Sequence, residues 1–156
     1  MKKLIAIILL ITISFSNPIG GFQGSFSVSP SDAQSIGVGN VSIIQKNNVF
    51  GTQNNPALMN DNKYSTGLSF NNLSLDEYEH SFIVSFRIPP SAKATIGYIG
   101  NGVKNIEGRG YNGKITNTYK WSNHHLFFAF GIEPIQKISI GLKFNIFFQD
   151  IIEEVK

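Results

Sequence analysis

The chain has 156 residues and no cysteine, and charged residues make up 15% of it, against about 25% in typical globular proteins. Without cysteine, disulfide frameworks, thiolate catalysis and cysteine–metal sites are excluded. The formal charge of +3 includes Lys2 and Lys3, so the rest of the chain is close to neutral and gives no argument for nucleic-acid binding.

Residues 1–16 have the layout of a secretory signal peptide. Two lysines precede an apolar run from Leu4 to Ile13, and Ser14-Phe15-Ser16 offers a small-x-small site with cleavage expected before Asn17. The apolar run is shorter than the roughly 20 residues that a membrane-spanning helix needs. The sequence therefore predicts an exported protein.

From residue 64 onward, apolar side chains stand at even-numbered positions. In segment 137–147 these positions hold Ile138, Ile140, Leu142, Phe144 and Ile146. Phe147 is the one large apolar residue at an odd-numbered position there. The same parity recurs in 64–71, 80–88, 92–101 and 122–133. A period of two indicates strands with one apolar face, so we expect an all-β fold with five antiparallel strands.

The strand lengths and connections favour a transmembrane β-barrel. Most segments run to about ten residues, as membrane-spanning strands do, whereas globular strands have about five or six. Short proline-bearing links (89–91 and 133–136) alternate with a link of middle length (72–79) and a long Gly- and Asn-rich link (101–118), as turns and loops do in outer-membrane barrels. A soluble β-sandwich is the alternative, but its outer face usually carries many Lys and Glu.

Residues 17–62 form a different, N-terminal segment. Residues 35–44 (SIGVGNVSII) offer a sixth strand, and Asn55 and Pro56 suit the N-cap and first position of a short helix. We expect the turn Asn55-Pro56-Ala57-Leu58 to act as an internal plug element. Residues 63–156 would then be the first part of a barrel. Because the smallest barrels have eight strands, about six imply an incomplete chain; the alternative is that several copies close one barrel.

The order of these features resembles the PorV/PorQ family of outer-membrane proteins, which is similar to the fatty-acid transporter FadL. The resemblance rests on the signal peptide, the segment Ser35-Ile36-Gly37-Val38-Gly39-Asn40-Val41-Ser42, the Asn55-Pro56-Ala57-Leu58 turn and the long alternating strands. It implies an outer-membrane barrel associated with type IX protein secretion. The alternative is a FadL-like channel for hydrophobic small molecules. The expected partners are outer-membrane lipid and other secretion components, with no nucleic acid.

No residue pattern indicates an enzyme, a cofactor or a metal site. Ser122 and His124 share a strand face, but that face is the predicted lipid-facing one and no carboxylate orients the histidine. His124 and His125 are adjacent and point to opposite faces, and His80 stands alone. The glycines of 97–102 and 108–110 follow no nucleotide-binding pattern. The acidic residues at 76–79 are expected in a solvated loop. Lys93, Lys137, Lys143 and Arg87 on the polar face leave no clear apolar ligand pocket.

Overall fold

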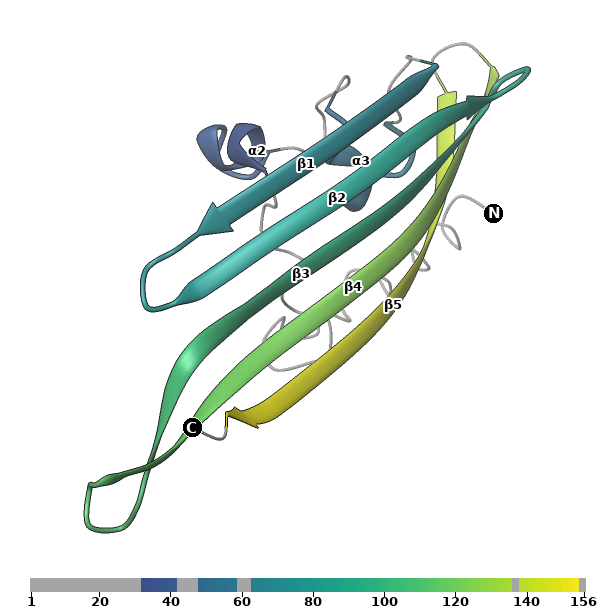
Figure 1. The fold of residues 1–156 in the computed structure, drawn as a ribbon. Coiled ribbons are helices and arrows are strands. Elements are labelled where there is room, and N and C mark those ends of the chain that lie inside the picture. Colours follow the sequence, from purple (N-terminus) through teal and green to yellow (C-terminus); the bar gives the residue numbers. More distant parts are fainter. Residues whose placement is uncertain (1–31, 42–47, 59–62, 136–137, 155–156) are drawn as a thin grey trace, which may run out of the picture.

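The structure is a computed structural model that describes residues 32–41, 48–58, 63–135 and 138–154. The predicted signal peptide lies outside these residues. Two short helices, α2 (Ala33–Gly37) and α3 (Gly51–Asn54), precede five strands: β1 (Tyr64–Asn72), β2 (Glu77–Ile88), β3 (Ala92–Arg109), β4 (Ile115–Ile135) and β5 (Ile138–Glu154) (Figure 1). No helix among the described residues is long and apolar enough to cross a membrane.

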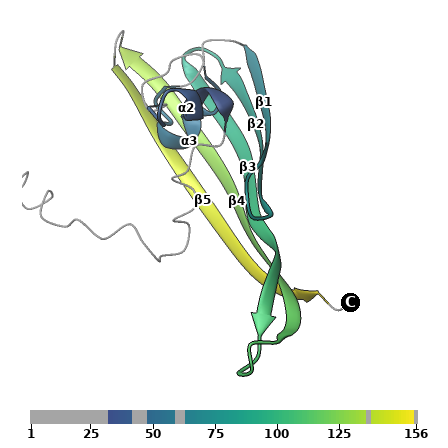
Figure 2. The same cartoon turned by 90° about the vertical axis from the view of Figure 1, so that its left-hand side faces the viewer.

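The strands form one antiparallel sheet in which each strand pairs with the next in chain order (Figure 1). All five predicted segments are strands, so the all-β, antiparallel prediction is confirmed. The two helices lie together on one side of the sheet (Figure 2). We call this side the inner face; it carries the odd-numbered side chains of residues 65–71, 79–87, 93–101, 123–131 and 139–147. The even-numbered side chains form the outer face.

The prediction of a long loop at 101–118 is wrong. β3 continues to Arg109 and β4 begins at Ile115, so only residues 110–114 form the tip of a hairpin that projects beyond its neighbours (Figure 1). Shifts in the register between Val103 and Ile106 and at Gly108 mark β-bulges, and Asn105 takes a φ of 54° there. Asn105 and Gly108 therefore lie at bulges within the hairpin, whereas Gly110, Asn112 and Gly113 belong to its tip.

The other connections are short. The link between β1 and β2 shrinks from the predicted 72–79 to residues 73–76, closed by a hydrogen bond from the Leu73 amide to the Glu77 carbonyl (2.9 Å). The predicted turn at 89–91 is confirmed. In the link predicted at 133–136, Glu133–Ile135 still belong to β4, and residue 136 lies outside the described residues.

The predicted strand at 35–44 is wrong where the structure describes it. Ala33–Gly37 form helix α2, because the Asp32 carboxylate caps it by accepting from the Ser35 amide (3.1 Å). Residues 42–44 of that prediction lie outside the described residues. The described part of the chain therefore holds five strands and not six.

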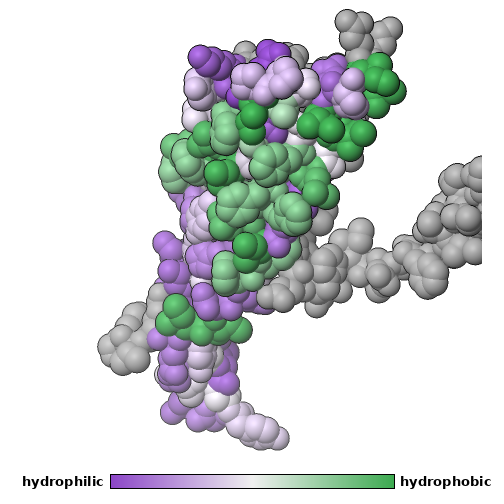
Figure 3. Space-filling view, turned by 90° about the vertical axis from the view of Figure 1, so that its right-hand side faces the viewer, coloured by the Kyte–Doolittle hydropathy of each residue, from purple (hydrophilic) through white to green (hydrophobic). Residues whose placement is uncertain are grey.

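The polarity of the two faces is the reverse of that in a soluble sheet. The buried apolar cluster is small and lies on the inner face, where Val49 from the N-terminal segment meets Ile83, Ile99, Phe127 and Ala129. Most large apolar side chains are exposed instead, and Figure 3 shows them gathered in a broad zone above the mostly hydrophilic hairpin. On the outer face they include Leu68, Phe70, Phe82, Ile96, Phe128, Phe130, Ile132, Ile140, Leu142, Phe144, Ile146 and Phe148.

Candidate functional site

The candidate site is the inner face where residues 48–58 lie against the sheet. Two glycines of the strands make room for this contact, and a third makes room for a ring of the sheet itself. A Cβ at Gly67 would come within 2.5 Å of the Val49 side chain, and one at Gly141 would overlap the backbone of Pro56 and Ala57. A Cβ at Gly97 would overlap the ring of Phe127, which is fully buried. The inner face therefore has hollows that accept the N-terminal segment and one aromatic ring.

Lys143 of β5 provides a polar tie to the same segment. Its ammonium group donates a hydrogen bond to the carbonyl of Gln53, in the last turn of α3, and lies 5.6 Å from the centroid of the Phe127 ring. A cation is favourable there because the last carbonyls of a helix lack partners within the helix. Lys143 thus fixes the end of α3 on the sheet.

Next to Lys143, His125 contributes a second polar group to the inner face. It is fully buried, its Nε2 lies 3.0 Å from Oδ1 of Asn145, and its ring stacks on Phe147 at 4.6 Å. Two strands thereby share an amide–imidazole pair in the middle of the sheet. The pair has a structural explanation, since it links β4 to β5.

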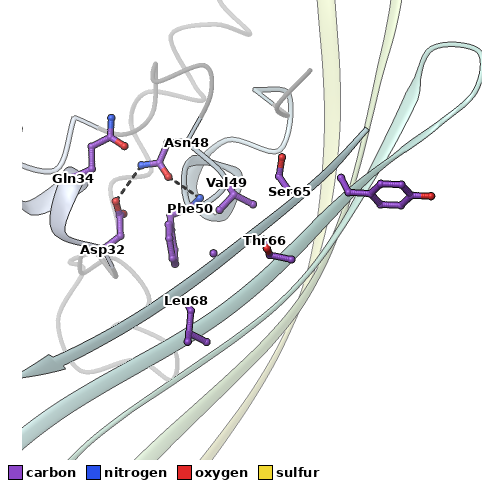
Figure 4. A pocket seen from close by; sticks show the side chains of 10 residues that line it. Asp32, Gln34, Asn48, Val49, Phe50, Ser65, Thr66 and Leu68 are labelled. Carbon is purple, nitrogen blue, oxygen red and sulfur yellow. Dashed lines mark hydrogen bonds between the residues drawn. The ribbon is translucent and has the colours of Figure 1, made fainter. Parts of the chain in front are cut away.

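A buried carboxylate joins α2 to the segment before α3. Asp32 accepts from the Ser35 amide and hydroxyl (3.1 and 2.5 Å) and from the Asn48 side-chain amide (3.1 Å). The side-chain oxygen Oδ1 of Asn48 in turn accepts from the Phe50 amide (2.9 Å), and Figure 4 shows these two hydrogen bonds of the Asn48 side chain. This network satisfies the carboxylate, so it reads as a structural clamp between two short helices.

The turn Asn55-Pro56-Ala57-Leu58 differs from its prediction. Asn55 is the C-cap of α3 and not the N-cap of a following helix, with an extended backbone (φ −139°, ψ 97°). The cause is Pro56, because a proline disfavours the helical conformation in the residue before it. The Asn55 side chain accepts from the Ala57 amide (3.1 Å), and the Leu58 amide donates to the Asn55 carbonyl (3.1 Å). The turn does lie against the sheet, over Gly141.

A cavity of about 500 Å³ opens beside β1, between that strand and α2 (Figure 4). Asp32, Gln34, Asn48 and Val49 line one side, and Tyr64 to Leu68 line the other. Consecutive strand residues of both faces reach it, so the cavity extends around the edge of the sheet. Among the described residues β1 pairs only with β2, which leaves this edge able to accept another strand.

The residues considered for chemistry are not brought together on the inner face. His124 lies on the outer face and bonds to the Tyr98 hydroxyl (2.7 Å), whereas His125 is buried on the inner face, so their predicted opposite orientation is confirmed. The prediction that His80 stands alone is wrong, because its ring stacks on Tyr78. No group of three His, Asp or Glu residues that could hold a metal ion occurs in the described parts of the chain.

The cross-strand register explains why sequence reasoning missed the contacts of His80. His80 and His124 both face Gly100, from β2 and β4 respectively. They are far apart in the chain, and only the pairing of three strands brings their rings to one place. The one signal in the sequence was that both histidines stand at even-numbered positions, which places them on the same face of the sheet.

No protein-family model, curated protein or solved structure matches this chain. Its own geometry therefore carries the functional argument.

Replacing Asn55 by Ala should loosen the N-terminal segment without unfolding the sheet. The change removes the bond to the Ala57 amide, which contributes about 0.5–1.5 kcal/mol. In the full-length protein we expect faster protease cleavage between residues 48 and 58 and unchanged heat-modifiable migration. Asn54→Ala, at the exposed neighbouring position, is the control and should leave cleavage unchanged. A variant that loses heat-modifiable migration would show that the turn is needed for sheet formation.

Proposed function

We propose that this sheet is the membrane-spanning wall of an outer-membrane β-barrel, with its outer face against lipid and residues 32–41 and 48–58 inside as a plug. One observation carries the proposal. No Lys, Arg, Asp or Glu stands at an even-numbered position in 64–70, 80–88, 92–98, 124–132 or 138–148. These are the outer-face positions, and no described segment covers them. A soluble sheet would carry charged residues on a face exposed to water.

The register turns these positions into continuous apolar rows across the sheet. One row is Leu68, Phe82, Tyr98, Leu126 and Ile146; the next is Thr66, Val84, Ile96, Phe128 and Phe144; the third is Tyr64, Phe86, Ala94, Phe130 and Leu142. From Ile132 to His124 the band covers eight residue steps, or about 27 Å along the strand. With a tilt of about 40° its height is about 20 Å, close to the roughly 25 Å band of outer-membrane barrels.

The free edges of the sheet support the same proposal and add a requirement. In hydrocarbon each unpaired backbone group costs several kcal/mol, so the outer edges of β1 and β5 must both be paired in the membrane. The cavity beside β1 marks one of the places where a further strand would lie. The proposed barrel therefore contains more strands than the five described here.

For the role of this barrel we propose the PorV/PorQ type, acting with components of type IX protein secretion. The resemblance of residues 35–42 and of the Asn55-Pro56-Ala57-Leu58 turn supports it. The inner face supports it over a FadL-like channel. Its apolar side chains Ile83, Ile99 and Phe127 already pack with Val49, and the other buried side chains include Ser81, Ser85, Thr95 and His125, so little apolar surface is left for a hydrophobic ligand.

Lysine on the outer face should block insertion, whereas lysine on the inner face should not. Leu142→Lys and Phe128→Lys place a charge in the apolar band, where it costs roughly 2–4 kcal/mol near the midplane. Ser139→Lys, an exposed odd-numbered position of the same strand as Leu142, is the matched control. We expect the control in the outer-membrane fraction with heat-modifiable migration, and the two outer-face variants absent from it. Equal behaviour of all three would contradict the proposed orientation of the sheet.

The secretion role has a separate test. Cross-linking of the full-length protein in its native outer membrane, followed by purification, should recover secretion components, and deletion of the protein should impair release of secreted proteins. Unimpaired release together with reduced uptake of long-chain fatty acids would favour the channel instead.

A further inference from the structure

Four aromatic and imidazole rings form a cluster on the outer face, at the end of the apolar band nearest the long hairpin. We call Tyr78, His80, Tyr98 and His124 the ring cluster. Tyr78 and His80 stack nearly in parallel (5.9 Å between centroids, 4° between planes), and His80 lies 5.7 Å from Tyr98. The Tyr98 hydroxyl bonds to Nδ1 of His124 (2.7 Å). Three strands thus contribute to one continuous polar-aromatic surface.

Two glycines of β3 make this arrangement possible. A Cβ at Gly100 would come within 2.5 Å of Nε2 of His80, and a Cβ at Gly102 within 2.8 Å of the Tyr78 hydroxyl. The register places Gly100 between His80 and His124, and Gly102 between Tyr78 and Ser122. The rings therefore lie over the bare backbone of β3, with their polar atoms directed across the sheet.

Two lysines give the cluster a positive charge. The ammonium groups of Lys104 and Lys120 lie 5.0 and 6.0 Å from the centroid of the Tyr78 ring. Among nearby carboxylates, Glu79 is buried on the inner face, and Asp76 accepts from the Asn105 amide (3.0 Å). Asp150 of β5 pairs with Ser122 of β4, two residues from Lys120, so this carboxylate is a diagonal neighbour of Lys120 and lies two strands away from Lys104 of β3. The surface around Tyr78 therefore carries two ammonium groups with hydroxyl and imidazole groups beside them.

The position of the ring cluster points to a lipid ligand. It borders the row of Leu68, Phe82, Leu126 and Ile146, so an amphiphile can place its acyl chains on the apolar band and its headgroup on the cluster. Phosphate oxygens accept strong hydrogen bonds from ammonium, hydroxyl and imidazole groups. We propose that the ring cluster, Lys104 and Lys120 bind the phosphate headgroup of an anionic membrane lipid. This rests on the proposed membrane-spanning role of the sheet.

The test compares two lipids with the same acyl chains, phosphatidic acid and diacylglycerol. Each is titrated into full-length protein in detergent, and bound lipid is measured by native mass spectrometry. Wild type should retain phosphatidic acid in preference to diacylglycerol. Lys104→Gln with Lys120→Gln should weaken retention of phosphatidic acid about tenfold or more, because each lysine near an anionic headgroup contributes substantially to binding.

The control carries the same change of charge elsewhere. Lys63→Gln with Lys114→Gln removes a lysine that lies 5.6 Å from the Tyr64 ring, at the other end of the sheet, and one at the hairpin tip. This double variant should bind phosphatidic acid within about twofold of wild type. Tyr98→Phe keeps the ring, loses the hydroxyl and should weaken binding about threefold.

Three results would overturn the inference: no preference for phosphatidic acid, an equal loss in the control, or competition by inorganic phosphate at the same concentration as the lipid. Heat-modifiable migration and membrane fractionation of the same proteins separate the two proposals. Wild type that does not insert contradicts the membrane-spanning role itself. Wild type that inserts but shows no preference contradicts only the headgroup site.

Discussion

If the sheet spans a membrane as we propose, contact between its apolar outer face and the surrounding hydrocarbon is the interaction on which the rest of this structure depends. Burying apolar surface stabilises a protein by about 25 cal/mol per Å², and most of the large apolar side chains of this sheet are left exposed by the described chain. The cluster beneath residues 48–58 is small by comparison. A lipid environment stabilises the outer face without any further protein layer. It also requires that every strand edge be paired, because hydrocarbon offers backbone groups no hydrogen bonds.

The inner face meets a different requirement, because the short irregular segment of residues 48–58 has to pack against the sheet there. Val49 and Phe50 meet the sheet at Gly67, and the turn after Asn55 meets it at Gly141. Lys143 also donates a hydrogen bond to the end of α3, so the N-terminal segment is held by packing at Gly67 and Gly141 and by this polar contact. The glycines that looked unremarkable in the sequence therefore decide where this segment lies. On the outer face, Gly100 and Gly102 likewise leave space for the rings of His80 and Tyr78.

Sequence periodicity predicted the five strands and their faces because a period of two is a direct consequence of strand geometry. It failed at 101–118, where Gly108 and Asn105 suggested a loop although they occupy bulges of a paired hairpin. The prediction of a strand at 35–44 failed because Asp32, just before that segment, accepts from the Ser35 amide and caps a helix there. Asn55 was predicted to begin a helix. Instead it ends α3, because Pro56 disfavours the helical conformation in the residue before it. The ring cluster depends on the register of three strands, which no local pattern specifies.

Accessibility of single cysteines along β5 tests the orientation of the sheet most directly, and these 156 residues contain no cysteine, so each substitution adds the one thiol of this region. Cysteines would replace Leu142, Phe144 and Ile146 on the outer face and Ser139, Asn145 and Gln149 at odd-numbered positions, in the full-length protein within open membranes. A water-soluble maleimide should label the odd-numbered set and leave the even-numbered set protected until the membrane is dissolved and the protein denatured. Labelling of both sets at equal rates before denaturation would contradict a sheet whose outer face lies in lipid.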